Sequence, residues 1–159
     1  WVTAWVAITD SNEHNGCMRM WAGSHKEDLK EHDQMFNEGN LLTRGQTVNN
    51  VPLSETIPLI LKAGQMSLHH PTVVHGSNLN QSNDRRIGFV IQSYIGTNVK
   101  QVLGKNSVQL ARGFDEYNYH KTIGRPKSLM NKDDLEVKKL ENDNLQKIFY
   151  AGSKKKGQY

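Results

Sequence analysis

Clusters of turn-forming residues divide the first 95 residues of this 159-residue chain into short runs, and this pattern restricts the folds that the chain can adopt. Residues 10–16 and 76–84 consist mostly of Asp, Asn, Ser and Gly, which favour turns. The runs around them are rich in Val, Ile, Trp and Thr and lack a helical period. Many short strands separated by such turns predict a β-sandwich or barrel. The expected strands are residues 1–8, 17–21, 57–61, 65–70, 73–75 and 85–95.

The pattern changes after residue 125. Residues 128–140 carry apolar side chains at helical spacing, with acidic residues early and lysines late, which suits the dipole of a helix. We expect one or two helices within residues 126–150, peripheral to the β-rich part. A chain of this length fits one domain, and no stretch has the composition of a linker, so residues 1–159 are expected to form a single domain.

Composition excludes several classes of protein. No apolar run approaches the roughly 20 residues that span a bilayer, which argues against an integral membrane protein. The single cysteine, Cys17, cannot form an internal disulfide, which favours a reducing compartment and a cytoplasmic location. The net charge is +4, with much of the excess at 138–139 and 154–156, which is typical of a solvated tail and not of a nucleic-acid-binding face. Neither a membrane nor a nucleic acid is therefore expected as a partner.

One histidine stands out among the seven of the chain because of its setting. His75 ends an apolar run and precedes a Gly-Ser turn, and the next run begins with Arg85 and Arg86. Strand ends at the mouth of a barrel are frequent places for small-molecule and metal sites. Alternation from Arg86 places Gln92 on the same inward face, and Arg19 is a further candidate for the substrate pocket. The long polar excursion over 25–50 is a candidate lid.

Five blocks in order resemble the phytanoyl-CoA dioxygenase family, whose members are iron(II)- and 2-oxoglutarate-dependent oxygenases. They are residues 3–8, 15–19, 23–26, 63–65, and 70–77 with Asn80, Ser82 and Arg86. The resemblance covers most of residues 2–95. It implies a mainly β fold of the double-stranded β-helix type, a cupin-like jelly roll, here followed by a C-terminal helix.

The resemblance also implies roles for four residues. The family binds iron(II) through two histidines and one carboxylate, and its distal histidine falls on His75. Arg86 falls on the arginine that grips the far carboxylate of 2-oxoglutarate, which suits the two parallel hydrogen bonds of a guanidinium. Ser77 matches a position near that carboxylate, and Trp5 matches an indole that lines the cosubstrate pocket. No residue of this chain is assigned as a catalytic acid or base.

The chain departs from the family pattern at the metal. The first two ligands of the family form a His-X-Asp motif upstream of the Trp5 block, and this chain begins too late to contain it. The nearest substitute, His25-Lys26-Glu27, has the features of an exposed charge run, and we do not expect it to bind the metal. We therefore expect a truncated chain that is inactive by itself, with an exposed apolar strand edge that a second copy would cover.

These observations favour a dioxygenase that hydroxylates a C–H bond of a small organic substrate, with iron(II) as cofactor and 2-oxoglutarate as cosubstrate. A related halogenase is an alternative, because the residue that separates the two reactions lies upstream of Trp1. A further alternative is a cupin-like jelly roll that binds a small acid, either without catalysis or with a different metal-dependent activity. The spacing of Arg86 from His75 favours the oxygenase, since a generic sugar-binding sandwich has no need of it.

Overall fold

The computed structural model describes residues 1–36, 42 and 45–151. The chain divides into two compact units, of which the first combines Trp1–Asp33 with Thr47–Ile95 and the second combines Gln34–Gln46 with Gly96–Tyr159. The predicted single domain over 1–159 therefore stays a prediction. Parts of the 25–50 excursion, residues 37–41 and 43–44, lie outside the described residues, as do the basic residues 154–156.

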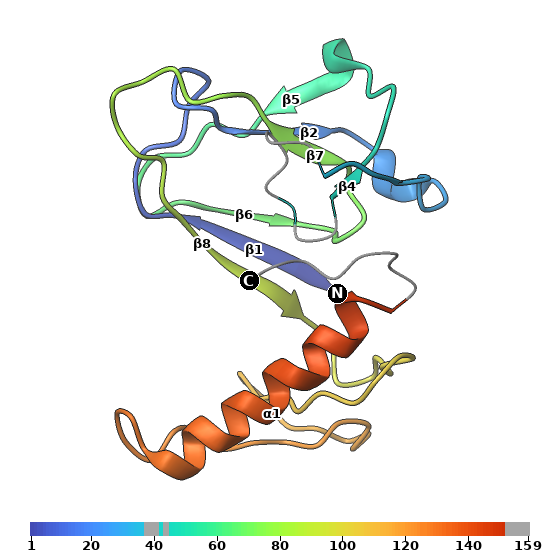
Figure 1. The fold of residues 1–159 in the computed structure, drawn as a ribbon, viewed down its shortest axis with the longest axis vertical. Coiled ribbons are helices and arrows are strands. Elements are labelled where there is room, and N and C mark those ends of the chain that lie inside the picture. Colours follow the sequence, from blue (N-terminus) through green and yellow to red (C-terminus); the bar gives the residue numbers. More distant parts are fainter. Residues whose placement is uncertain (37–41, 43–44, 152–159) are drawn as a thin grey trace. The chain divides into compact units, whose positions relative to one another are not determined.

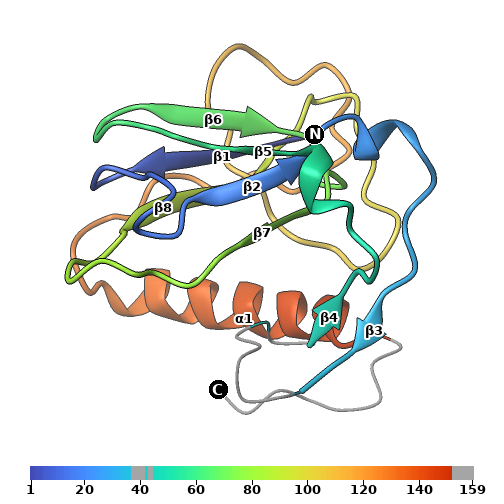
Figure 2. The same cartoon turned by 90° about the horizontal axis from the view of Figure 1, so that it is seen from above.

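Two antiparallel three-stranded sheets form the first unit (Figure 1). In one sheet, β1 (Val2–Ala7) lies between β6 (Met66–His69) and β8 (Gly88–Tyr94). In the other, β2 (Met18–Trp21) lies between β5 (Thr56–Pro58) and β7 (His75–Ser77). Figures 1 and 2 show the sheets as two stacked layers. The remaining short elements are η1 (Ser24–Lys26), β3 (Asp33–Gln34), β4 (Gln46–Thr47) and η2 (Leu53–Glu55).

The expectation of a mainly β fold with a C-terminal helix is confirmed, and the antiparallel sheets are consistent with a jelly roll. The expected turn at 76–84 is shorter than predicted, because Gly76 and Ser77 pair with β2. The expected strand at 57–61 is limited to Thr56–Pro58, and Leu61 makes only an isolated bridge with Ser11.

The C-terminal helix, α1 (Lys132–Phe149), begins where a capping residue allows it. The side chain of Asn131 accepts a hydrogen bond from the backbone N–H of Asp134, which satisfies one of the free donors of the first turn. Within the second unit, the Glu141 carboxylate accepts hydrogen bonds from the backbone N–H and the hydroxyl of Ser107, at 3.0 and 2.7 Å. These bonds hold the pKa of Glu141 below its ordinary value, chiefly through the Ser107 backbone.

Few apolar side chains of the described residues are buried, and Trp5 is the largest of them, at 6% exposure. Its indole lies against the backbone of Gly88, where an added Cβ would come within 2.1 Å of the indole Cζ2. The absence of a side chain at position 88 therefore makes room for the indole. The other buried apolar residues are Ala4, Ala7, Cys17 and Val73.

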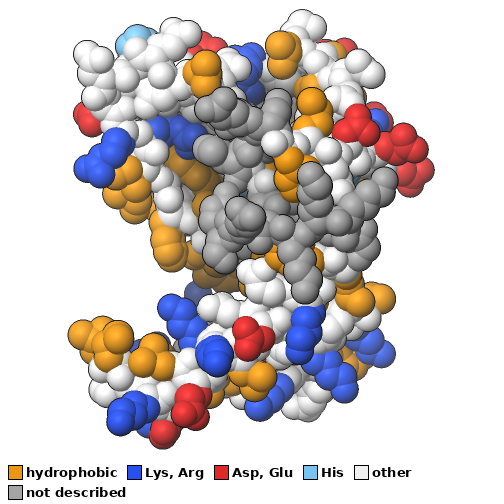
Figure 3. Space-filling model, viewed as in Figure 1, with side chains coloured by type: hydrophobic (Ala, Val, Ile, Leu, Met, Phe, Trp, Pro, Cys, Tyr) orange, Lys and Arg blue, Asp and Glu red, His pale blue; other side chains and the backbone are white. Residues whose placement is uncertain are grey.

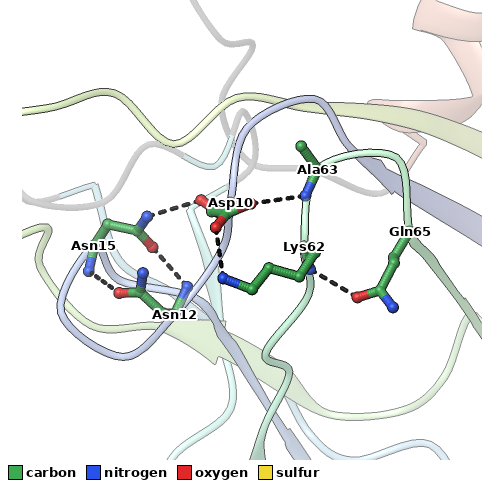
Figure 4. Close-up of polar contacts among 6 residues, drawn as sticks. All are labelled: Asp10, Asn12, Asn15, Lys62, Ala63 and Gln65. Carbon is green, nitrogen blue, oxygen red and sulfur yellow. Dashed lines mark hydrogen bonds and ion pairs between the residues drawn. The ribbon is translucent and has the colours of Figure 1, made fainter.

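A group of polar contacts joins two distant turns of the first unit (Figure 4). The Asp10 carboxylate accepts hydrogen bonds from the Lys62 ammonium and the Ala63 backbone N–H, each at 2.9 Å. The Asn15 amide donates to the Asp10 carbonyl at 2.8 Å, and Asn15 also exchanges hydrogen bonds with Asn12. The hydrogen bond from Lys62 lowers the pKa of Asp10. These contacts connect the sequence blocks at 15–19 and 63–65.

The outward face of the β6-β1-β8 sheet is apolar. Met66, Leu68 and Phe89, which pair with Val6 or Ala4, are each more than half exposed. Figure 3 shows further apolar side chains exposed among charged ones on the face that it draws. Coverage of a strand edge by a second copy stays a prediction, as does a cytoplasmic location. Within the described residues, no helix is both long and apolar enough to cross a bilayer.

We predict that Gly88→Ala destabilises the protein because the new methyl group collides with the Trp5 indole. Overpacking of this kind costs about 1–3 kcal/mol of unfolding free energy. Urea unfolding followed by tryptophan fluorescence measures the difference. Gly76→Ala is the matched control, since a Cβ at this other strand glycine meets nothing within 4 Å. Equal stability of the two variants would contradict the proposed packing.

Candidate functional site

The facing sides of the two sheets bring four of the predicted site residues, Trp5, His75, Ser77 and Arg86, to one interior between the sheets. Trp5 pairs with Ser67 and Val90, so these three side chains point to the same face of the first sheet. Met18 and Met20 pair with Ser77 and His75, and these four share one face of the second sheet. Contacts between the two groups, described below, show that the faces point toward each other.

Arg86 joins the two sheets. Its Nη2 donates a long hydrogen bond of 3.4 Å to the Ser77 hydroxyl, and its Cζ lies 5.5 Å from the centre of the Trp5 ring. The second distance is that of a cation–π contact. Among the described residues, no carboxylate forms an ion pair with Arg86, although the side chain is only partly exposed. The guanidinium therefore has donors available for an acidic ligand.

The turn between β7 and β8 is fixed by its own side chains. The Asn80 amide donates to the Asp84 carbonyl at 2.7 Å and accepts from the Ser82 backbone N–H at 2.8 Å. The Gln81 N–H donates to the His14 carbonyl at 3.0 Å, which connects this turn to the first one. Gly16 makes room for the crossing, because a Cβ there would lie 2.6 Å from the Asn78 carbonyl oxygen. These contacts hold the chain where Ser77 and Arg86, nine residues apart, can meet.

The hydrogen bond of His75 determines which ring nitrogen is free. Its Nδ1 lies 2.9 Å from the Val73 carbonyl oxygen, and since a carbonyl only accepts, Nδ1 carries the proton. Nε2 is then left with its lone pair. A backbone carbonyl behind Nδ1 is the usual support of a metal-binding imidazole. The His75 side chain is exposed, so an ion can reach it.

A buried serine positions the strand that carries His75. Ser24, at 3% exposure, donates from its hydroxyl to the Trp21 carbonyl at 2.8 Å and accepts from the Val74 N–H at 2.9 Å. The Trp21 N–H in turn donates to the Val74 carbonyl. The block at 23–26 therefore has a structural role beside His75.

Sequence reasoning missed His69. It pairs with Thr3 on the inward face of the first sheet, and its ring centre lies 5.7 Å from that of His75. Burial, and then the neighbouring His75, lower the pKa of His69 below its ordinary value. The sequence signal that could have identified His69 is alternation, which places it on the same face of its strand as Ser67. The sequence does not show that this face points toward the sheet of His75.

Of the two predicted pocket residues, Arg19 is turned away from this interior and Gln92 lies beside a register shift between β1 and β8. Arg19 pairs with Gly76, so it lies on the face of β2 opposite to His75. Its guanidinium is engaged by the Glu13 carboxylate at 2.7 Å and by the hydroxyl and carbonyl of Thr56, both at 2.9 Å. The side chain of Gln92 is exposed, and its carbonyl accepts from Trp1 Nε1 and the Thr3 hydroxyl where the β1–β8 register slips. A bulge at this point interrupts the alternation that predicted an inward Gln92.

The substitute motif at 25–27 lies at the surface, where His25, Lys26 and Glu27 are all exposed. Glu27 forms an ion pair with Lys30, and the His25 ring packs 5.6 Å from that of His70. Within the described ranges, no three His, Cys, Asp or Glu side chains are grouped closely enough to hold a metal ion. The Cys17 thiol is buried, and burial raises its pKa, which disfavours the reactive thiolate.

Comparison with known proteins places these features in a family context. Residues 1–88 match the family model described as Phytanoyl-CoA dioxygenase. The peroxisomal phytanoyl-CoA dioxygenases of Mus musculus and Homo sapiens are 31% and 29% identical to the chain over 86 residues. The matched part is 54% of this chain and 25% of each relative, so the chain spans about a quarter of the length of these curated relatives.

Solved structures agree on the fold. The apo form of the non-heme monooxygenase ThoJ matches with a TM-score of 0.77 and 30% identity, over 92% of this chain and 52% of that chain. The nickel complex of ThoJ matches with a TM-score of 0.72 and 28% identity, over 94% and 51%. EvdO2 from Micromonospora carbonacea var. aurantiaca, complexed with 2-oxoglutarate, has a TM-score of 0.50 and 19% identity, over 56% and 36%, and indicates the fold alone.

We predict that Ser24→Ala loosens the strand that leads to His75, because the partly buried Val74 N–H loses its acceptor. An unsatisfied buried donor costs about 1–3 kcal/mol. Chemical denaturation measures this loss, and hydrogen exchange is expected to show faster exchange at the Val74 amide. Ser93→Ala, at an exposed position of β8, is the control. Unchanged Val74 exchange in Ser24→Ala would show that the hydroxyl does not support the strand.

Proposed function

The chain belongs to the phytanoyl-CoA dioxygenase family, and we propose that it provides the 2-oxoglutarate-binding side and one iron ligand of a non-haem dioxygenase. The chain spans about a quarter of the length of its curated relatives, so the activity of a whole enzyme is itself part of the proposal. The observation that carries the proposal is the Arg86 guanidinium, which joins Ser77 and Trp5 in the interior and has no carboxylate partner among the described side chains.

The three side chains fit the far carboxylate of 2-oxoglutarate. Arg86 supplies two parallel N–H donors and a positive charge, which match the two oxygens of a carboxylate. The Ser77 hydroxyl, 3.4 Å from Nη2, is placed to donate a further hydrogen bond to the same group. The buried Trp5 indole restricts the guanidinium on one side and offers an apolar surface to the methylene groups of the cosubstrate.

His75 fits the role of one iron ligand. Its Nδ1–H is held by the Val73 carbonyl, so Nε2 presents its lone pair to a metal ion and the ring keeps a fixed orientation. The other ligands of the family set are not provided by a cluster within the described residues. When bound, iron(II) with 2-oxoglutarate and oxygen supplies the oxidising power to hydroxylate a C–H bond. The contribution of this chain is to orient the cosubstrate and to fix one imidazole.

The proposed substrate is a small organic molecule that binds in the same interior. Met18 and Met20 lie on the His75 face of β2, and Val90 lies on the Trp5 face of β8. Apolar lining with a few polar groups is typical of pockets for small organic ligands. The reaction proposed is hydroxylation of a C–H bond.

We predict that Arg86→Gln weakens the binding of 2-oxoglutarate by tenfold or more, since hydrogen bonds to a charged group contribute about 1.5–3 kcal/mol. Titration of 2-oxoglutarate into the chain, followed by ligand-observed NMR, measures the dissociation constant. Arg85→Gln is the matched control, because Arg85 has the same charge, whereas the hydrogen bond to Ser77 and the cation–π contact with Trp5 are made by Arg86. Equal losses in the two variants would refute a specific role of Arg86.

Ser77→Ala is expected to weaken 2-oxoglutarate binding by about two- to tenfold, because a hydrogen bond typically contributes about 0.5–1.5 kcal/mol. The same titration measures the change, and Ser93→Ala is expected to bind like the unaltered chain. We call Arg86, Ser77 and Trp5 the acidic-ligand site. Our account of this site predicts that Ser77→Ala loses less affinity for 2-oxoglutarate than Arg86→Gln. The reverse order would contradict it.

A further inference from the structure

The second unit carries an apolar turn that the proposed function does not use. Val102 is 99% exposed, more than any other large apolar side chain of the described residues, and its neighbour Leu103 is 55% exposed. Lys100 and Lys105 lie on either side of this pair, and both are exposed. Within the described part of the chain, neither lysine forms an ion pair. We call residues 100–105 the apolar turn.

Side-chain hydrogen bonds give the apolar turn a defined shape. The Gln101 amide donates to the Leu103 carbonyl at 2.8 Å and to the side-chain oxygen of Asn106 at 3.0 Å, and it accepts from the Asn106 backbone N–H at 3.0 Å. Gly104, at a φ of +73°, packs against α1, where an added Cβ would come within 2.6 Å of Ile148 Cδ1. Because the turn is already ordered, its binding to a partner loses little conformational entropy.

Two other apolar side chains of the described residues are nearly as exposed, but their surroundings differ. Leu129 is 94% exposed, and the nearest lysine along the chain, Lys127, pairs with the Asp133 carboxylate at 2.6 Å. Leu79 is 86% exposed in the turn between β7 and β8, and no Lys or Arg occurs within four residues of it. Of the three, Val102 alone lies between lysines that have no acidic partner among the described side chains.

The distribution of charge along the chain favours an anionic partner for the second unit. Residues 96–159 contain 13 Lys and Arg and seven Asp and Glu, whereas residues 1–95 contain seven and nine. Such an asymmetry is typical of chains whose basic part binds a nucleic acid or a membrane. The expectation that neither is a partner rested on assigning the excess charge to a solvated tail, but Lys138 and Lys139 lie within α1.

An anionic lipid surface fits the apolar turn better than a nucleic acid or a folded protein. Aliphatic side chains have no aromatic face on which bases can stack. A stable protein interface buries about 800 Å² per partner, which is more than one protruding turn provides. A bilayer accepts a single turn, because the aliphatic pair inserts among the acyl chains while the lysines keep their ammonium groups among the anionic headgroups. Tyr119, whose ring centre lies 4.5 Å from the Lys100 ammonium, also suits a membrane interface.

We propose that the apolar turn attaches this protein peripherally to anionic phospholipid membranes. Val102 and Leu103 insert into the bilayer, and Lys100 and Lys105 contact the headgroups. The proposal does not rest on the binding of 2-oxoglutarate or of a metal, because the turn belongs to the second unit and the acidic-ligand site to the first. Failure of one therefore leaves the other intact.

Sedimentation of the full chain with vesicles tests the attachment. We expect saturable binding at about 0.1 M salt to phosphatidylcholine vesicles that contain phosphatidylserine, and binding at least tenfold weaker to phosphatidylcholine alone. Val102→Asn is expected to weaken binding by about tenfold, because the inserted side chain becomes polar. Lys105→Gln is expected to weaken it by about fivefold. The matched controls Leu79→Asn and Lys26→Gln, at exposed positions of the first unit, are expected to change it by less than twofold.

The possible outcomes separate a membrane from other anionic partners. Two-dimensional NMR spectra with native-like dispersion establish that the variants are folded. No binding to the phosphatidylserine vesicles, unchanged binding in Val102→Asn, or an equal loss in Leu79→Asn would each overturn the proposal. Tighter binding of a single-stranded oligonucleotide, unaffected by Val102→Asn, would overturn it in favour of a nucleic acid.

Discussion

The contact between the Trp5 indole and the bare backbone of Gly88 is the constraint on which the interior depends. Trp5 is the largest buried apolar side chain of the described residues, and any side chain at position 88 would occupy its place. The indole lies beside the Arg86 guanidinium, which in turn reaches the Ser77 hydroxyl on the other sheet. The absence of a Cβ at Gly88 therefore allows the packing that holds the Arg86 guanidinium between the two sheets.

A separate set of hydrogen bonds positions the metal-binding face. Ser24 holds Val74, and the Val73 carbonyl holds the His75 ring. These contacts fix both the strand and the tautomer of His75, so the free nitrogen follows from backbone geometry. The acidic-ligand site and the imidazole therefore rest on different local structures, and a change in one need not abolish the other. His69 lies near both of these parts, because it belongs to the same sheet as Trp5 and its ring is next to that of His75.

Much of the fold could be predicted from the sequence because turn clusters and apolar alternation are local signals. The resemblance selected Trp5, Ser77 and Arg86, and the structure brings these three together, although their roles stay predictions. Local patterns do not reveal which face of one sheet opposes another, so His69 was overlooked. Arg19 was assigned to the pocket without knowledge of its register with Gly76, which turns it toward Glu13 and Thr56. A bulge opposite Thr3 similarly broke the alternation that predicted Gln92.

The central claim is that Trp5, Ser77 and Arg86 bind the carboxylate end of 2-oxoglutarate between the two sheets. Intermolecular nuclear Overhauser effects between the cosubstrate methylene protons and the aromatic protons of the chain test it most directly. The account predicts contacts from the methylene groups to the Trp5 indole. Contacts confined to aromatic residues of the other unit, such as the neighbouring rings of Tyr117 and Tyr119, would contradict it.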